Sequence, residues 1–407
     1  MRRVAWVLLL AFAFAIPWEY SLDLGAPVGN VARVAGLLLV LVAIPAVLQA
    51  GRMRRPGLLQ WLVLALFVWF CCSYFWTIDQ AATLERLRGY FQELMIVWLV
   101  WEFVESPRDL RLLMKVFVAG CWVLALLTVA DFRSEEAIAA GQFRFAAYDQ
   151  DPNDVARYLS YGFPFAALLA AGERERWQKW LALGYLPAAG FAVVLTASRG
   201  GLLAASVALA GSAVLLARGR SRAILAGVLA LPVAGAAVWM LVPADTLARL
   251  ATIPEQLSSG DLNQRLNIWG AGWQAFTRAP VMGTGAGTFV QAAGLSSIDT
   301  AHNTALSIAV SSGLVGLTLF AAVVVCAAIV ALRSRGGLRL ALATALGAWL
   351  VASSIGTVEE NRTTWLLLGL MAVAGRLVRE NAEGLLECFP DSLAAEAELG
   401  HELAGAG

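Results

Sequence analysis

Residues 301–325 read AHNTALSIAVSSGLVGLTLFAAVVV, and this stretch decides the fold class. It contains no Asp, Glu, Lys or Arg, and after Asn303 it has the roughly 20 mostly apolar residues that an α-helix needs to cross a membrane. Asn303 and Thr304 are favourable helix N-caps, so the helix should begin here with His302 directly before it. Apolar runs of about this length recur from one end of the chain to the other. We therefore expect an all-α polytopic membrane protein.

Composition supports the same class. The 407 residues are 59% hydrophobic and 14% charged, with a mean hydropathy of +0.70. A soluble domain carries about 25% charged residues, so a soluble fold is excluded. The net charge of +1 indicates no particular partner, and nothing suggests nucleic-acid binding. The five cysteines show neither metal-ligand spacing nor a disulfide framework, and we interpret them as small apolar fillers.

Hydropathy predicts about twelve transmembrane helices of about 17–25 residues each. They are expected to start near Val4, Val28, Gly57, Gly89, Asp109, Val155, Trp177, Gly200, Ala223, Asn303, Leu338 and Thr363. These spans should be nearly free of charged residues at mid-membrane. The first span could pass for a signal peptide, but we interpret it as an uncleaved signal anchor because many spans follow.

Lys and Arg gather in alternate loops, and short basic loops favour the cytoplasm. The basic loops hold Arg2 and Arg3; Arg52, Arg54 and Arg55; Arg108, Arg111 and Lys115; Arg174, Arg176 and Lys179; Arg218, Arg220 and Arg222; Arg333, Arg335 and Arg339; and Arg376 and Arg379. Both termini are therefore expected in the cytoplasm and the long loop 244–302 on the outer, periplasmic side. We predict a single transmembrane catalytic domain, residues 1–377, and a short cytoplasmic tail, residues 378–407, in which His401 is solvated.

Three outer residues are candidates for chemistry. His302 precedes a helix N-terminus, whose field disfavours imidazolium, and a neutral imidazole can act as a general base. Arg199, in TASRGG between two spans, is a lone cation on the outer side, and two glycines follow it so that a large group could approach the backbone. Arg265 lies in DLNQRLNIWGAGWQAFTRAP, which has apolar residues at helical spacing and predicts a helix lying flat at the membrane interface. Each of the three could instead be an interfacial anchor.

Other outer features are less specific. Trp269 and Trp273 suit the headgroup layer, and Arg144, Arg249 and Arg278 are weaker candidates. Asp151-Pro152-Asn153 is a turn and cap motif, and Gly283–Gly287 is interpreted as a tight, flexible turn. Glu359 and Glu360 could orient His302, bind an acceptor sugar, or simply form an acidic loop.

Together these residues indicate a reaction class. Arginine binds phosphate through a planar fork and is permanently charged. Two arginines with one base suit a diphosphate leaving group and a hydroxyl nucleophile, without a metal-ligand cluster. The prediction is glycosyl transfer from a lipid diphosphate at the outer leaflet.

At these residues the chain resembles the O-antigen ligase family of integral membrane glycosyltransferases, which also includes Wzy-type polymerases and protein O-oligosaccharyltransferases. The matching segments are DPND at 151–154, TASRGG at 196–201, RLNIWGAGWQAFTRAPVMGTGAGTF at 265–289 and AHNTALSIAVSSGLVG at 301–316. Two positions depart from the family pattern: Ala305 where members often have an aromatic residue, and Ser312 where they often have a glutamate.

The resemblance implies a GT-C-like architecture in the bacterial inner membrane and an inverting, metal-independent transfer without cofactor. The donor would be a glycan on undecaprenyl diphosphate and the acceptor a hydroxyl of lipid A–core. His302 would be the base, with Arg199 and Arg265 on the diphosphate, while Asn303, Trp269 and Arg144 would help to bind substrate.

Three alternatives remain. A polymerase would use another lipid-linked repeat unit as acceptor and often has two large outer loops, whereas only one is expected here. A protein glycosyltransferase often has a C-terminal extension. A transporter of lipid-linked glycans would need charged residues near mid-span, which the predicted spans nearly lack.

Overall fold

The computed structural model describes residues 1–22, 24–25, 29–148, 150–173, 175–218, 235–236, 238–258, 264–296, 299–380 and 385–389. Within these ranges the secondary structure is helical. The start of the span expected near Ala223 lies outside the described residues, as does His401. Most of the predicted tail also lies outside them.

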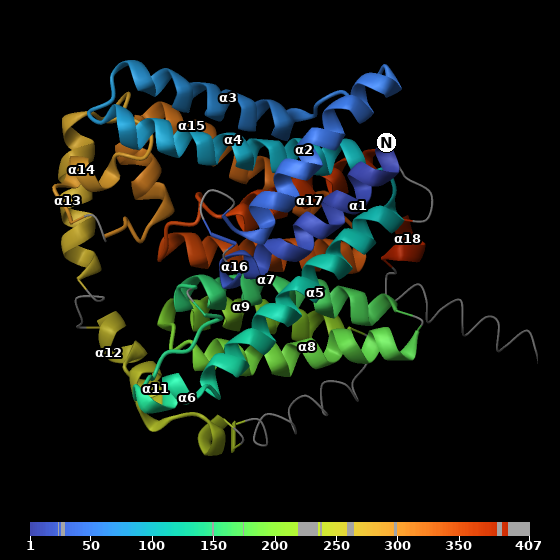
Figure 1. The fold of residues 1–407 in the computed structure, drawn as a ribbon, viewed down its shortest axis with the longest axis vertical. Coiled ribbons are helices and arrows are strands. Elements are labelled where there is room, and N and C mark those ends of the chain that lie inside the picture. The colour runs from blue at the N-terminus through green and yellow to red at the C-terminus, as the bar shows by residue number, and fades with distance from the viewer. Residues whose placement is uncertain are drawn as a thin grey trace, which may run out of the picture.

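The chain forms a bundle of long helices whose axes run roughly side by side, with short helices gathered at one end (Figure 1). The long helices are α1 Arg2–Ala15, α2 Val31–Ala50, α3 Leu58–Cys72, α4 Gln80–Phe103, α5 Pro107–Phe132, α7 Pro152–Gly172, α8 Arg176–Leu195, α9 Arg199–Ala217, α15 Thr304–Arg333, α16 Gly336–Ser354 and α17 Arg362–Arg379. The short ones are η1 Ile16–Ser21, η2 Ser73–Phe75, α6 Glu135–Ala139, α11 Ala244–Ala251, α12 Ile253–Ser258, α13 Arg265–Arg278, α14 Phe289–Ala293 and α18 Leu385–Cys388.

Eight segments of the described chain are long and apolar enough to cross a membrane: Arg2–Ser21, Val31–Ala50, Leu58–Phe75, Pro107–Phe132, Arg176–Leu195, Arg199–Ala217, Thr304–Arg333 and Gly336–Ser354. A polytopic membrane protein is thus confirmed, but the count of twelve is not. Three further expected spans, α4, α7 and α17, are long helices with more polar or charged residues. Hydropathy follows the position of a helix in the bundle. The most apolar helices, α2 and α15, are the least buried, whereas α7 and α17 lie inside the protein and face other helices.

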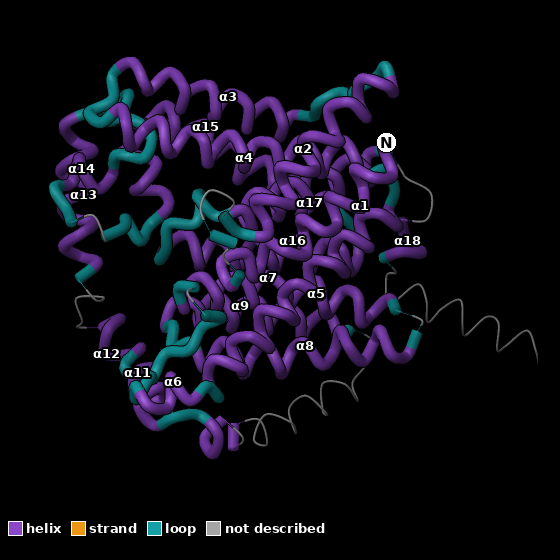
Figure 2. The backbone as a smooth tube through the Cα atoms, viewed as in Figure 1, coloured by secondary structure: helices purple, strands orange, loops and turns teal. Residues whose placement is uncertain are grey.

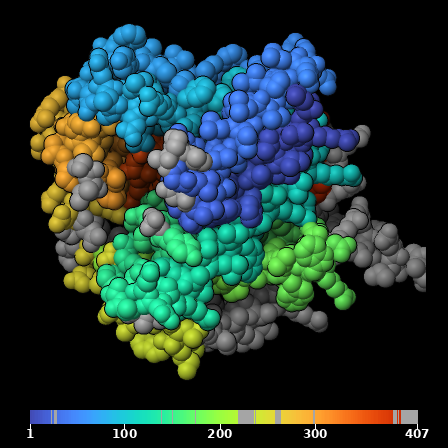
Figure 3. All heavy atoms as spheres, in the orientation of Figure 1, coloured from blue at the N-terminus to red at the C-terminus, as the bar shows by residue number. Residues whose placement is uncertain are grey.

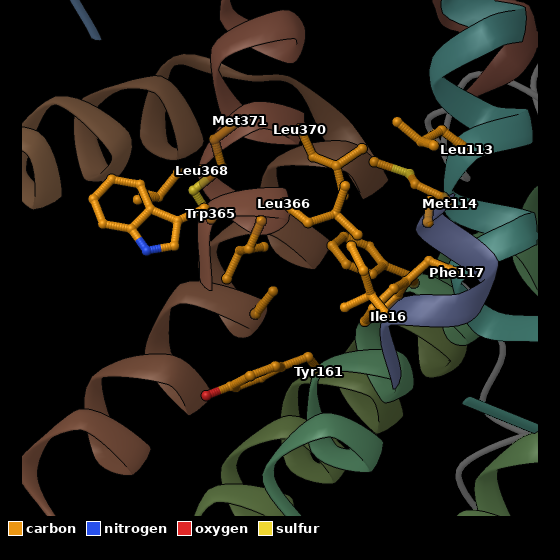
Figure 4. Close-up of a cluster of buried hydrophobic side chains, with 14 of the residues drawn as sticks. Ile16, Leu113, Met114, Phe117, Tyr161, Trp365, Leu366, Leu368, Leu370 and Met371 are labelled. Carbon is orange, nitrogen blue, oxygen red and sulfur yellow. The ribbon is translucent and has the colours of Figure 1, made fainter. Parts of the chain in front are cut away.

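Helices α7 and α17 form the centre of the bundle. Every residue from Val155 to Ala170 in α7 and from Thr363 to Leu377 in α17 is buried. Helix α7 packs against α5, α8, α9 and α16, and α17 packs against α4 and α15. Figure 4 shows part of the core, where Leu366 and Leu370 of α17 lie close to Phe117 of α5 and Ile16 of η1.

The expectation that the spans are nearly free of charge is wrong for the interior helices. Glu93 of α4 is 4% exposed and Arg157 of α7 is 9% exposed. Arg157 forms an ion pair with Asp154 one turn earlier. A helix that faces protein on all sides can carry such groups because neighbouring helices, rather than lipid, surround them.

The basic loops meet at one end of the bundle. Arg2 forms ion pairs with Glu102 and Glu105, and the backbone N–H of Arg54 donates to Glu102 at 2.8 Å. Loops predicted to share a side of the membrane are therefore neighbours in space. The N-terminus and α18 lie at this end, and α1 and α2 cover part of the face seen in Figure 3.

The opposite end is built from α6 and the segment 244–302. Helices α11, α12, α13 and α14 gather there, and the loops between them are concentrated at the same end (Figure 2). The helix predicted around Arg265 is observed as α13, which begins at that residue. The expected helix start at Asn303 is also observed, because its side chain accepts from the N–H of Leu306 at 2.9 Å.

Helix α15 is broken at Gly313, which has φ 66° and ψ −169°. The break frees backbone groups that the segment 280–285 satisfies. The N–H groups of Thr284 and Gly285 donate to the carbonyls of Val310 and Ser311, each at 2.9 Å, and the N–H of Leu314 donates to the Pro280 carbonyl at 2.8 Å. The glycine turn is therefore hydrogen-bonded to both sides of the break in α15, while its flexibility stays a prediction. A broken helix is tolerated where other backbone completes its hydrogen bonds.

Candidate functional site

A polar cavity of about 190 Å³ lies at the end of the bundle formed by α11–α14. Its walls come from the loop before α7, the start of α9, helices α11 to α13, and the residues that precede α15 and follow α16. The lining residues are Arg144, Asn153, Arg199, Gly200, Leu203, Arg249, Ile253, Gln256, Arg265, Trp269, His302 and Ile355. The cavity thus gathers four arginines and one histidine from segments far apart in sequence, and no carboxylate is among the described residues that line it.

Arg199 is placed by a tight turn between two helices. It is the first residue of α9, and Ser198 caps that helix by accepting from the N–H of Gly201 at 3.1 Å. Gly201 packs against α7, because a Cβ there would lie 2.2 Å from the Cβ of Ala156. This glycine therefore serves helix packing, while Gly200 lines the cavity.

Two side-chain-to-backbone hydrogen bonds link the turn before α9 with Arg249 of α11. The Nε of Arg199 donates to the Arg249 carbonyl, and the Nε of Arg249 donates to the Ala197 carbonyl, both at 3.2 Å. Each bond uses the Nε of the guanidinium. Burial, followed by the charges of Arg144 and Arg199, lowers the pKa of Arg249. The sequence alone ranked Arg249 as a weak candidate because its place in the loop gave no signal.

Arg144 joins the same turn from the loop before α7. Its Nε donates to the Thr196 carbonyl at 3.3 Å and its Nη2 donates to the Asn153 side-chain oxygen at 3.1 Å. Asn153 also accepts from the hydroxyl of Ser198 at 2.8 Å. The DPND motif therefore does more than start a helix, because its asparagine holds Arg144 beside the turn that carries Arg199.

Arg265 and His302 form the other side of the cavity. Trp269, one turn after Arg265 in α13, donates its indole N–H to the Ala301 carbonyl at 3.0 Å, which fixes α13 beside the residue that precedes His302. Burial lowers the pKa of Arg265, with further contributions from Arg157 and Arg199.

His302 has a strained backbone and a depressed pKa. Its φ is 47°, in the left-handed region that few non-glycine residues adopt. Its Nδ1 lies 3.2 Å from the hydroxyl of Thr300. Burial, then the charges of Arg265 and Arg157, lower the pKa of the imidazole, whereas Asp151 and Asp299 raise it. The balance favours a neutral ring near pH 7.

Asn303 is separate from the cavity lining. Its side-chain oxygen caps α15, and its side-chain nitrogen donates to the Ser354 carbonyl at 3.2 Å. These contacts give it a structural role at the start of α15. Of the six site residues predicted from the sequence, the other five line the cavity.

Arg157 was missed by the sequence analysis because it lies within a predicted apolar span. It contacts the chain near Gly356, where a Cβ would approach its Nη1 to 2.3 Å. Its charge reaches both Arg265 and His302. The Asp154 carboxylate that pairs with it also accepts from the side chain of Asn361 at 3.1 Å.

Glu359 and Glu360 lie outside the cavity lining. Glu360 forms an ion pair with Arg86 at 2.6 Å. The Glu359 side chain is 1% exposed, and burial, followed by the neighbouring charge of Glu360, raises its pKa to about 8. An orienting contact with His302 is not observed among the described residues.

The residue types in this cavity favour an anionic ligand. Four guanidinium groups offer planar pairs of N–H donors, which match phosphate oxygens. In the described part of the chain, no three His, Cys, Asp or Glu side chains lie close enough together to hold a metal ion. One neutral imidazole beside the arginines could take a proton from a hydroxyl group.

Comparison with known proteins gives one family. Residues 184–321 match the family model described as O-antigen ligase, and no curated protein matches the chain. The matched segment contains Arg199, Arg249, Arg265 and His302 but begins after Arg144 and Asn153. The match confirms the resemblance that the sequence motifs indicate.

Proposed function

We propose that this chain, a relative of the O-antigen ligases, transfers a glycan from undecaprenyl diphosphate to a sugar hydroxyl of lipid A–core at the periplasmic face of the bacterial inner membrane. The observation that carries the proposal is the cavity in which His302 lies with Arg199 and Arg265, and among whose described lining residues there is no carboxylate. Such a site binds a diphosphate and leaves one base for the acceptor.

The proposed reaction is a single displacement. The acceptor oxygen forms a bond to the anomeric carbon while the bond from that carbon to the phosphate oxygen breaks, and its electron pair leaves with the diphosphate. His302 takes the acceptor proton on Nε2, which requires the tautomer whose Nδ1–H faces the Thr300 hydroxyl 3.2 Å away. The anomeric carbon inverts because the acceptor attacks opposite the leaving group.

The arginines have a separate task. Arg199 and Arg265 would neutralise the charge that grows on the departing diphosphate, and such stabilisation is strongest in a partly dry site. Both are half-buried, and neither forms an ion pair with a carboxylate in the described ranges. Arg199 uses only its Nε, on the Arg249 carbonyl, so within these ranges its terminal nitrogens and the guanidinium of Arg265 keep N–H donors for the substrate.

His302→Ala tests the base. The variant should fold and insert but lose about 10²–10⁴-fold in transfer rate. Arg265→Lys should also be impaired because Lys lacks the planar fork, while Arg278→Lys is the matched control on the same helix. Full transfer by His302→Ala would refute the assignment of the base, and equal rates for the two Arg→Lys variants would reduce Arg265 to an anchor.

A Wzy-type polymerase is the second candidate, because the family match supports both ligase-type and polymerase-type activities. Deletion of the protein separates them when the host's lipopolysaccharide is analysed on a gel. Loss of a ligase leaves bare core with glycan retained on the carrier lipid, whereas loss of a polymerase leaves core bearing a single unit. Unchanged lipopolysaccharide would contradict both.

A transporter was disfavoured because the predicted spans nearly lacked charged residues. The buried charges of Glu93 and Arg157 remove that argument, so transfer of glycan by the purified protein is the decisive assay.

A further inference from the structure

The cavity holds more positive charge than the proposed roles of Arg199 and Arg265 use. Arg144 and Arg249 line it as well, and within the described chain none of the four arginines forms a salt bridge. The carboxylate charge that acts on Arg144 is that of Asp151, which caps α7. Like charges collected in a partly buried space repel one another, so an anionic ligand would stabilise this arrangement.

The arginines fall into two groups around Arg199. Arg144 and Arg249 are bonded to the turn 196–199 through the carbonyls of Thr196 and Ala197. Arg265 is on α13, which is fixed by Trp269 to the chain beside His302. Arg199 lines the same cavity as both groups, and its charge acts on Arg144, Arg249 and Arg265.

The backbone contacts leave donors free. Arg249 uses its Nε on the Ala197 carbonyl, and Arg199 uses its Nε on the Arg249 carbonyl. In the part of the chain that the structure describes, their terminal nitrogens have no protein acceptor. These bonds fix the direction of the two guanidinium groups while keeping an N–H edge of each for phosphate oxygens.

We propose that Arg144, Arg199 and Arg249 form a second phosphate subsite, which binds the lipid-linked phosphate of the donor, while Arg265 with Arg199 binds the sugar-linked phosphate. This inference rests on the proposed function for the order of the two phosphates. The bond that breaks must face the acceptor oxygen that His302 deprotonates, so the sugar-linked phosphate lies on the Arg265 side. The lipid-linked phosphate is one P–O–P linkage further away, on the side of the turn 196–199.

The test is a comparison of two ligands that differ by one phosphate. Full-length protein in nanodiscs is titrated with geranylgeranyl diphosphate and with geranylgeranyl monophosphate. Wild type should prefer the diphosphate, and Arg249→Gln and Arg144→Gln should each reduce that preference about tenfold or more, because a charge-assisted contact to the second phosphate is lost. Arg278→Gln, which removes an exposed charge from α13, should leave the preference unchanged.

The outcomes are separable. An unchanged preference in both variants, or an equal loss for the two ligands, overturns the subsite. Each variant must have a thermal midpoint close to that of wild type. The two substitutions lie on different segments, so the ligand preference of one variant still tests the subsite if the other variant fails to fold. Failure of the proposed function would appear as wild-type protein that prefers the diphosphate but transfers no glycan. Transfer that depends on His302 with an unchanged ligand preference would instead retain the function and reject the subsite.

Discussion

Gly313→Ala should disrupt the end of the protein that carries the candidate site. Gly313 has φ 66° and ψ −169°, a backbone region that is essentially restricted to glycine. A Cβ at this position would lie 2.2 Å from the Val281 carbonyl oxygen and 2.6 Å from the Gly283 nitrogen. Both obstacles are backbone atoms, so no side-chain rotation can relieve the contact.

The loss of stability has two contributions. The strain of an alanine held at the φ and ψ of Gly313 costs about 1–3 kcal/mol. Displacing the segment 280–285 breaks four backbone hydrogen bonds to α15, each worth about 0.5–1.5 kcal/mol net. The expected destabilisation is about 3–9 kcal/mol, which for a chain of this length corresponds to a thermal midpoint about 4–10 °C lower. Because the segment before α15 carries His302, transfer should also be lost.

The assay is thermal unfolding of the detergent-solubilised protein, with Gly190→Ala as the control. Gly190 lies inside α8 and has open space where a Cβ would go, so alanine there should be neutral or slightly stabilising. If Gly313→Ala unfolds within about 1 °C of the control, then the docked segment does not support α15 and the reasoning is refuted.

Two further predictions concern pH. The pKa of His302 is lowered from 6.5, and only the neutral ring can accept a proton, so the acidic fall in the rate of transfer should have its midpoint below pH 6.5; a pH–rate profile with this midpoint above pH 6.5 would contradict the environment described for His302. The pKa of Glu359 is raised from 4.5 to about 8, so the folded state binds this proton more tightly than the unfolded state does. The free energy of unfolding should therefore fall as pH rises from 4.5 toward 8, by at most about 1.4 kcal/mol per pH unit. Glu359→Gln should remove this slope, and thermal midpoints of both proteins at pH 5 and pH 8 would show it; an identical pH dependence in the two proteins would reject the buried, protonated carboxyl.

The fold class and several helix boundaries could be predicted because they depend on local chemistry. Asn303 caps α15 through its own side chain, and α13 follows the helical spacing of its apolar residues. The number of transmembrane spans could not be predicted as well. Interior helices such as α7 are shielded from lipid by other helices, so hydropathy does not separate them cleanly from polar segments.

The candidate site was predicted in part. His302, Arg199 and Arg265 stand out as isolated polar residues next to apolar spans, and the structure places them on one cavity. Arg249 and Arg157 gave no such signal. The first lies in a polar connector and the second within a predicted span, and only their neighbours in space distinguish them from anchors and core residues.

The sequence by itself determined that this is an all-α membrane protein with motifs similar to those of O-antigen ligases, because hydropathy, helix capping and short motifs are properties of adjacent residues. Only the tertiary structure decided which groups share a cavity. Arg144 and Arg249 come from two separate segments and donate to backbone carbonyls of the turn that carries Arg199, and Arg199 donates to the Arg249 carbonyl in return. The break at Gly313 is likewise invisible in an apolar run, because its cause is a backbone segment about 30 residues away that completes the hydrogen bonds of the broken helix.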